Sequence, residues 1–114
     1  MYRLLEKPEI SGTCWIEFNV SGSNDTYEHW QASSRYASLD AMDAVYKVFA
    51  LCIENFNLYC PILIDHQMAR EVSMMLDGFA STGSKEAARK FASELSLFMR
   101  ESIAEEKFIW MLGV

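Results

Sequence analysis

The chain has 114 residues, which is enough for one domain with a sizeable core and too few for two ordinary domains. Apolar residues make up 51% of it and charged residues 23%, and only 2 prolines and 5 glycines occur, so the composition excludes disordered and low-complexity sequence. The formal net charge of −6 disfavours nucleic acid and anionic membranes as partners, because both carry negative phosphates. We therefore expect one folded domain over residues 1–114.

Two features of the sequence concern the compartment in which the protein works. Its longest uncharged stretch, residues 55–64, is about half of the roughly 20 apolar residues that a membrane-spanning helix needs, and charges follow soon after the first residue, unlike in a secretion signal. The cysteines Cys14, Cys52 and Cys60 are an odd number in apolar surroundings, which is typical of reduced thiols. We expect a cytoplasmic protein with three free thiols and no membrane association.

The first third of the chain has the pattern of β-strands. Between residues 14 and 20, apolar side chains alternate with polar or aromatic ones such as Glu17, which predicts a half-buried strand. Turn-forming residues follow at 21–25, and residues 26–33 resume a mostly extended, aromatic-rich composition. These segments predict a β-hairpin, and residues 1–5 are a candidate for a further short strand.

The hydrophobic period changes near Ser38 from two residues to about 3.6, which predicts three helices in the rest of the chain. Ser38 is a good N-cap for a first helix that ends around residues 55–57, and Asp65 is one for a second helix that ends near residues 81–83. A third helix follows from Ser84. The expected inner faces are Met42, Val45, Tyr46, Phe49, Cys52, Ile53 and Phe56 in the first helix, Met68, Val72, Met75, Leu76 and Phe79 in the second, and Ala87 or Ala88, Phe91, Leu95, Phe98, Met99, Ser102 and Ile103 in the third.

Three apolar segments need a separate interpretation. Residues 58–64 contain Pro61, which favours an edge strand or a buried connector over a central strand. Residues 107–114 are mostly apolar, and we expect them to dock on the domain itself. Met74 and Met75 could line a binding groove, but their helical spacing favours core positions. Strands followed by helices indicate an α+β fold, with an N-terminal antiparallel β-hairpin or small sheet packed against about three α-helices.

Patterns of catalytic and metal-binding residues are weak in this sequence. Asp65 and His66 follow Cys60 closely, but the apolar neighbours of Cys60 disfavour the thiolate that a catalytic cysteine needs. The two histidines, His29 and His66, have no second ligand at a metal-binding spacing, and no Gly-rich phosphate loop occurs. We therefore expect no enzymatic activity, no metal and no cofactor.

Acidic residues are concentrated in the first half of the chain. Between Pro8 and Tyr46, six acids stand against Arg35 alone, so this stretch has a net charge of −5. Such a field speeds encounter with basic proteins, and Trp and Tyr are favoured at binding hot spots. Alternatively, the acids form a solvated face and the aromatic residues cover the sheet. The candidate partner-binding residues are Glu17, Asp25, Tyr27, Glu28, Trp30, Asp40 and Asp43.

The chain resembles the small acidic immunity proteins of bacterial toxin systems, in particular those of contact-dependent growth inhibition. The resemblance rests on Trp15-Ile16-Glu17-Phe18, on residues 27–30 and on the amphipathic segment 38–46, and it covers about half of the chain. It implies a non-enzymatic inhibitor that binds the basic nuclease domain of a cognate toxin and blocks its active site or substrate groove. The alternative is a small acidic secretion chaperone that binds an extended effector segment; such chaperones are usually dimeric, so a homodimer is left open.

Overall fold

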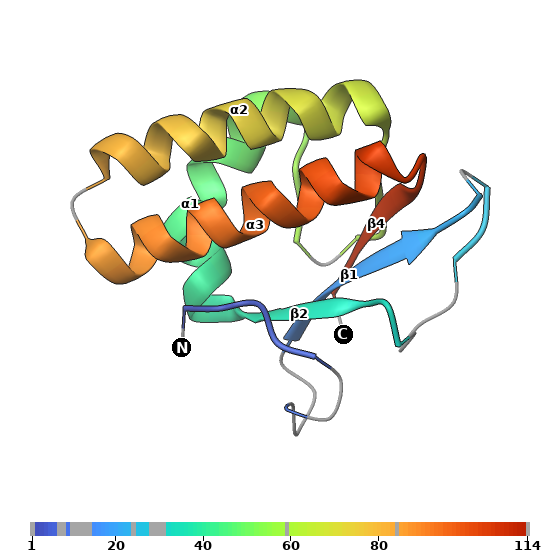
Figure 1. Cartoon of the computed structure of the whole chain (residues 1–114), viewed down its shortest axis with the longest axis horizontal. Coiled ribbons are helices and arrows are strands. Elements are labelled where there is room, and N and C mark those ends of the chain that lie inside the picture. Colours follow the sequence, from blue (N-terminus) through green and yellow to red (C-terminus); the bar gives the residue numbers. More distant parts are fainter. Residues whose placement is uncertain are drawn as a thin grey trace.

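The computed structural model describes residues 2–6, 9, 15–23, 25–27, 32–58, 60–83 and 85–113. Over these residues the protein has an α+β fold with three helices and a four-stranded antiparallel sheet, the fold class that the sequence predicts (Figure 1). None of the helices described is both long enough and apolar enough to cross a membrane. In chain order the elements are β1 (Trp15–Ser21), β2 (Arg35–Ser38), α1 (Leu39–Cys52), β3 (Ile62–Ile64), α2 (His66–Thr82), α3 (Glu86–Ala104) and β4 (Phe108–Gly113).

Side-chain caps place the starts of α1 and α2 where the sequence predicts them. Ser38 Oγ accepts a hydrogen bond from the backbone nitrogen of Ala41 at 3.1 Å, and Asp65 Oδ1 accepts one from that of Met68 at 2.8 Å. The predicted end of the first helix is wrong, because α1 ends at Cys52 and the next residue has an extended backbone. Local capping residues therefore determined the helix starts better than the apolar period determined the end.

The sheet has the strand order β2-β1-β4-β3, and every neighbouring pair is antiparallel (Figure 1). The C-terminal segment docks on the domain, as expected, and it does so as the central strand β4, which pairs with both β1 and β3. β3 is an edge strand, which agrees with the proline at position 61. At the other edge, Leu5 and Tyr36 exchange two backbone hydrogen bonds of 2.8 Å, so the N-terminal segment contributes a single bridge.

The partner strand of β1 lies further along the chain than predicted. Thr26 and Tyr27 are outside any strand, and most of the predicted strand at residues 26–33 falls on residues 28–31, which lie outside the described residues. The strand that pairs with β1 is β2, which begins at Arg35 and runs directly into α1. Extended composition did not locate this strand, because pairing is decided by cross-strand partners and burial.

The hydrophobic core lies between the three helices and one face of the sheet. Ile16 and Phe18 of β1 share this face with Ile109 and Met111 of β4, and all four side chains are buried. Most residues of the predicted inner helix faces are buried or half-buried, and Ala88 rather than Ala87 faces inward. The prediction is wrong for three side chains that α1 and α2 leave partly exposed, namely Tyr46, Met74 and Met75.

α2 and α3 run side by side in opposite directions over the sheet (Figure 1). Gly83 follows α2, and a Cβ atom there would lie 2.8 Å from the carbonyl oxygen of Phe79, which is too close for any other residue. Further along, Asp77 of α2 accepts a hydrogen bond of 2.8 Å from Ser96 Oγ and pairs with Arg100. These contacts hold α3 against α2 and leave the opposite side of α3 exposed above β2.

Candidate protein-binding site

Glu17, which the sequence suggested as a partner-binding carboxylate, is fully buried. It lies opposite Tyr36 and Leu112, on the face of the sheet that points away from the helices, and its exposed fraction is 0%. Its Oε2 accepts hydrogen bonds from Ser34 Oγ at 2.7 Å and from Asn19 Nδ2 at 3.4 Å. The prediction that Glu17 contacts a partner is wrong, because these hydrogen bonds satisfy its carboxylate inside the protein.

Tyr36 belongs to the same buried polar group. Burial and the negative charge of Glu17 raise the pKa of Tyr36 to about 12. Its phenol is therefore neutral over the whole physiological range of pH. We call the residues Glu17, Asn19, Ser34 and Tyr36 the Glu17 cluster and assign them to the interior of the fold.

The exposed carboxylates among the predicted residues do not share one surface. Asp25 follows the end of β1, whereas Asp40 and Asp43 lie near the start of α1. α1 begins beside the start of β1, because Trp15 pairs with Ser38. A strand of seven residues is about 20 Å long, so Asp25 and the other two carboxylates belong to opposite ends of the sheet.

The predicted aromatic residues are described only in part. Tyr27 is half-buried, and its ring lies 4.9 Å from the ring of Trp110 in β4. Trp110 Nε1 in turn donates a hydrogen bond of 3.4 Å to the carbonyl oxygen of Ser23. Tyr27 therefore packs on the sheet. Glu28 and Trp30 lie outside the described residues.

Asp40 and Asp43 line a pocket of about 280 Å³. The pocket lies where the start of α1, the end of α2 and the start of α3 meet the N-terminal segment. It brings two predicted carboxylates together with two aromatic rings and one lysine. We call it the Asp40 pocket; its lining residues are Tyr2, Asp40, Asp43, Ala44, Phe79, Lys85 and Ala88. Its volume is at the lower limit of the roughly 300 to 1,000 Å³ of ligand sites and is large enough for a side chain of a partner.

A second hollow surface, which sequence reasoning missed, follows α3 on the side of β2. It consists of two adjoining hollows of about 290 and 180 Å³, which have Arg35, Phe98 and Glu101 in common. Glu94, Glu101 and Glu105 are spaced by seven and then four residues, which places them on one face of a helix. This spacing was the signal in the sequence that could have indicated the surface. We call it the α3 groove; its lining residues are Leu4, Val20, Ser33, Arg35, Glu94, Leu97, Phe98, Glu101, Ser102 and Glu105.

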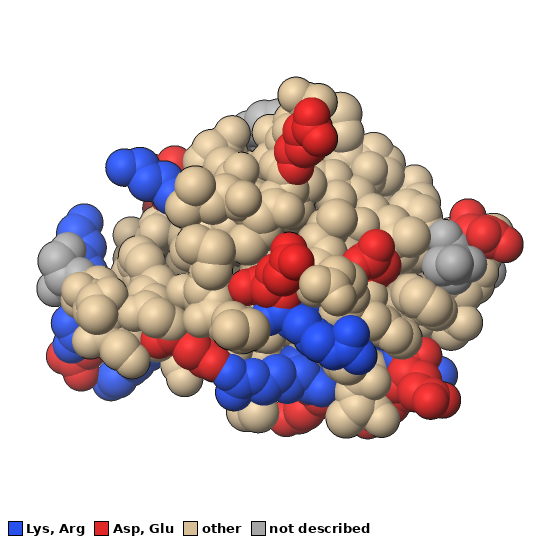
Figure 2. All heavy atoms as spheres, turned by 90° about the horizontal axis from the view of Figure 1, so that it is seen from above, with Lys and Arg blue, Asp and Glu red and all other residues tan. Residues whose placement is uncertain are grey.

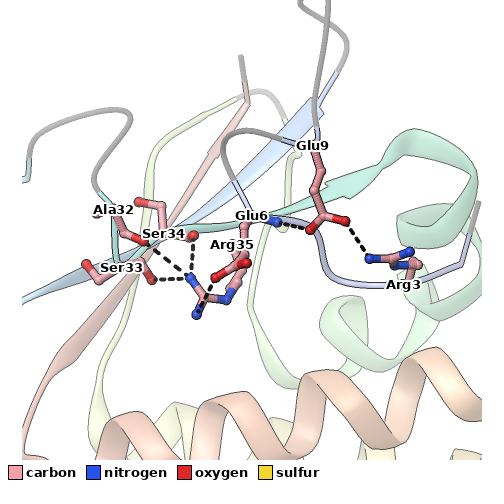
Figure 3. A network of polar contacts seen from close by, with 7 residues as sticks. All are labelled: Arg3, Glu6, Glu9, Ala32, Ser33, Ser34 and Arg35. Atoms are coloured by element: carbon pink, nitrogen blue, oxygen red, sulfur yellow. Dashed lines mark hydrogen bonds and ion pairs between the residues drawn. The ribbon is translucent and has the colours of Figure 1, made fainter.

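Arg35 is the basic residue of the α3 groove, and the surrounding chain holds its side chain in place (Figure 3). Its Nη1 donates hydrogen bonds to the carbonyl oxygens of Ser34 at 3.0 Å and of Ala32 and Ser33 at 3.4 Å. Its Nη2 lies 3.5 Å from Glu6 Oε1. Because Glu6 shares the charge of Arg35, the three glutamates leave the groove with an excess of negative charge.

Apolar side chains are exposed on the outer sides of α1 and α2. Leu51 is 74% exposed and Met74 is 70% exposed, and Met75 Sδ lies 3.4 Å from Cys52 Sγ, so the two helices adjoin here. In the view from above α2, Lys and Arg lie along the left and lower borders, Asp and Glu are scattered over the face including its middle, and much of the surface between them is uncharged (Figure 2).

The two described cysteines, Cys52 and Cys60, are free thiols. Burial, together with the charge of Glu71, raises the pKa of Cys52, which lowers its thiolate fraction. Cys60 is exposed. Cys14 lies outside the described residues, so the prediction of three free thiols stays open for that residue.

His66 does not form a nucleophilic or metal-binding group with its neighbours in the sequence. Its ring stacks on Phe108 with 4.7 Å between centroids, and its Nε2 lies 3.0 Å from the carbonyl oxygen of Lys107. Over the described ranges of the chain, no three His, Cys, Asp or Glu side chains are grouped so that they could hold a metal ion.

Comparisons with known proteins identify no relative. No protein-family model matches the chain, and no curated protein or solved structure matches it either. The features of the protein that bear on its function are the Asp40 pocket, the α3 groove and the net charge of −6.

Proposed function

We propose that this chain is an immunity-type inhibitor that binds a basic toxin domain and blocks its active site or substrate groove. The observation that carries the proposal is the Asp40 pocket, where two carboxylates adjoin the rings of Tyr2 and Phe79. A Lys or Arg side chain is favourable in such a place, because carboxylates form charge-assisted hydrogen bonds with it and aromatic faces attract cations. Toxin nucleases hold substrate phosphates with Lys and Arg, so an inhibitor that occupies these side chains excludes the substrate.

The net charge supports the same class of partner. A protein with a formal charge of −6 attracts a basic domain over a distance and so speeds their encounter. Within the pocket, Lys85 carries the opposite charge to Asp40 and Asp43. A cationic side chain of a partner would be attracted by the two carboxylates and repelled by Lys85. Removing a carboxylate of the pocket should therefore weaken the binding of such a partner, whereas removing the charge of Lys85 should strengthen it.

Association kinetics with the product of the adjacent toxin gene test this proposal. Asp40→Asn and Asp43→Asn should each weaken binding by about two- to tenfold, whereas Lys85→Gln should strengthen it. Asp25→Asn removes the same charge at the opposite end of the sheet and is the matched control, which should bind like the wild type. Association of the wild type should also slow as added salt shortens the Debye length from about 10 Å at 0.1 M to about 3 Å at 1 M.

Two further measurements separate binding from folding. Asp40 lies in the first turn of α1, where its charge stabilises the helix by up to about 1 kcal/mol, so thermal unfolding of each variant must be recorded as well. Cells that produce the toxin should survive with wild-type protein and less well with Asp43→Asn. If the toxin domain binds and all pocket variants bind and protect equally, the Asp40 pocket is not the contact. If the toxin domain does not bind at all, the immunity function is wrong.

One observation favours the alternative, a secretion chaperone. The exposed apolar side chains of Leu51 and Met74 are of the kind that hold an extended effector segment. A chaperone of this kind should form a stable dimer and bind an unfolded segment, whereas an immunity protein should form a stoichiometric complex with a folded domain. Size-exclusion chromatography with light scattering, on the free chain and on its complex, distinguishes the two.

A further inference from the structure

We infer that the α3 groove binds an amphipathic basic segment of another protein, with Lys or Arg side chains at both ends of the segment and an apolar side chain between them. This surface is formed by other residues than the Asp40 pocket. The inference therefore goes beyond the proposed function and holds for any partner that carries such a segment.

One part of the groove, in its larger hollow, is apolar. Leu97 is 56% exposed on the outer side of α3, although leucine is a residue that folding normally buries. Next to it, the ring of Phe98 is half-buried and packs edge-on against Phe18 of the core, with 6.2 Å between ring centroids. Leu4 of the N-terminal segment completes this part of the groove. An apolar side chain of a partner would therefore find a rigid aromatic surface here.

Three glutamates line the groove along α3, one near each end and one where the two hollows meet. Glu94 and Glu101 are seven residues apart on α3, which corresponds to about 10 Å along the helix axis, and Glu105 adds about 6 Å more. All three are exposed, and Glu94 also accepts a hydrogen bond from the backbone nitrogen of Leu4. The carboxylates thus extend over about 16 Å, the length of three turns of a partner helix. Charge complementarity selects a basic segment.

Arg35 sets the register of that segment. Hydrogen bonds to carbonyl oxygens and the ion pair with Glu6 hold its guanidinium in the middle of the groove, where both hollows meet. A partner cation at this point would be repelled. Basic side chains of the segment therefore belong near Glu94 at one end and near Glu105 at the other, with the apolar side chain over Leu97 between them.

A synthetic peptide of about 12 residues, helical and with leucines on one face and lysines beside them, serves as the probe. Fluorescence anisotropy of the labelled peptide should show salt-dependent binding to the full chain, and a peptide with glutamates in place of the lysines should not bind. The double variant Glu101→Gln with Glu105→Gln should bind about fivefold more weakly. Leu97→Asn should bind about tenfold more weakly, because it removes the apolar contact in the centre.

Matched controls lie elsewhere on the surface. Glu54→Gln removes an exposed charge outside the groove, and Leu51→Asn removes an exposed leucine of α1; both should bind the peptide within about twofold of the wild type. Circular dichroism checks that every variant is folded. Asp40→Asn should not affect peptide binding, so a failure of this inference is distinguishable from a failure of the proposed function.

Amide chemical shifts, measured during the peptide titration, locate the binding site. We expect the largest shifts in α3 between Glu94 and Ala104 and at Arg35. The inference is overturned if the lysine peptide does not bind at about 1 mM, if the glutamate peptide binds equally well, or if the largest shifts lie outside the groove. It is also overturned if the groove variants bind like the controls.

Discussion

At the scale of single residues, the Glu17 cluster shows how polar side chains become part of the interior. Ser34 Oγ donates a hydrogen bond to Glu17 Oε2, and Asn19 Nδ2 donates one of 3.3 Å to Ser34 Oγ. Without such partners a buried carboxylate would destabilise the fold by several kcal/mol. The outer face of β1, where Glu17 and Asn19 lie, is as buried as the face toward the helices. Its residues therefore affect stability rather than partner binding.

Tyr36 gives this cluster a measurable dependence on pH. Its pKa is about 12 in the folded protein and about 10 in an unfolded chain, so the unfolded state loses the phenolic proton first as the pH rises. The contribution of Tyr36 to stability is thus complete below pH 10 and is lost between pH 10 and 12, by roughly 1 kcal/mol per pH unit. In denaturant unfolding, the stability of the wild type should fall relative to that of Tyr36→Phe over this interval, because only the wild type carries the phenol. A difference that does not change with pH would contradict the buried position of the phenol.

Glu106 has a left-handed backbone conformation whose energetic cost can be measured. It follows α3 with φ of 58°, and the hydrogen bonds from Glu106 to Ile103 and from Lys107 to Ser102, both 2.9 Å, form a Schellman motif. This left-handed conformation costs an ordinary residue about 1 kcal/mol relative to glycine. Glu106→Gly should therefore raise the free energy of unfolding by about 1 kcal/mol. Glu106→Gln removes the charge but keeps the side chain, so its free energy of unfolding should rise by much less than that of Glu106→Gly.

At the scale of elements, α1 connects the two layers of the fold. It follows β2 without a loop, it contributes Met42, Val45 and Phe49 to the core, and its first turn carries the carboxylates of the Asp40 pocket. Its Phe49 ring lies 6.4 Å from that of Phe18 in β1 and 5.5 Å from that of Phe56 after the helix. Damage to this helix should therefore affect both the core and the pocket.

Phe49→Ala tests the role of α1 directly. Phe49 is fully buried, and its removal should lower the free energy of unfolding by about 3 to 5 kcal/mol through lost burial and the remaining cavity. Tyr46→Ala, on the partly exposed side of the same helix, should cost only about 1 kcal/mol. Chemical denaturation provides both values. A change of less than about 0.5 kcal/mol for Phe49→Ala would mean that α1 does not hold the core together.

At the scale of the whole molecule, the two ends of the described chain are built into the same sheet. Leu5 bridges to β2 at one edge, and β4, at the other end of the chain, lies in the centre between β1 and β3. The two candidate surfaces follow from this arrangement. Tyr2 reaches the Asp40 pocket and Leu4 reaches the α3 groove because the N-terminal segment runs beside β2.

The central position of β4 predicts that the chain folds only when it is complete through this strand. A chain that ends at Lys107 lacks Ile109, Met111 and Leu112, which are all buried, and β1 and β3 lose their common partner. At about 2 to 5 kcal/mol for each of these side chains, the combined loss is as large as the 5 to 15 kcal/mol that stabilise a typical domain. Such a chain should be unfolded by circular dichroism and amide NMR, whereas a chain that ends at Gly113 should be folded. A folded truncated chain would show that β4 is dispensable.

The sequence by itself determined the features that depend on near neighbours. Ser38 and Asp65 mark helix starts because an N-cap bonds to a backbone nitrogen three residues away, and Pro61 marks an edge strand because proline has no amide hydrogen to donate. The order of strands before helices, and the apolar segment at the end of the chain, were likewise sufficient for the fold class and for internal docking. These signals depend on nearby residues, so they can be read without knowing which segments pair in the fold.

The tertiary structure alone decided which carboxylates are buried, which are exposed and which lie close together. Glu17 alternates with apolar residues like a solvent-exposed position, but the strand is buried on both faces, and Asp25 is separated from Asp40 by the length of β1. The Asp40 pocket joins Tyr2, Phe79 and Lys85 to α1, and the α3 groove joins Arg35 to Glu101. Such surfaces depend on contacts between segments far apart in the chain, whose pairing and register no local pattern encodes.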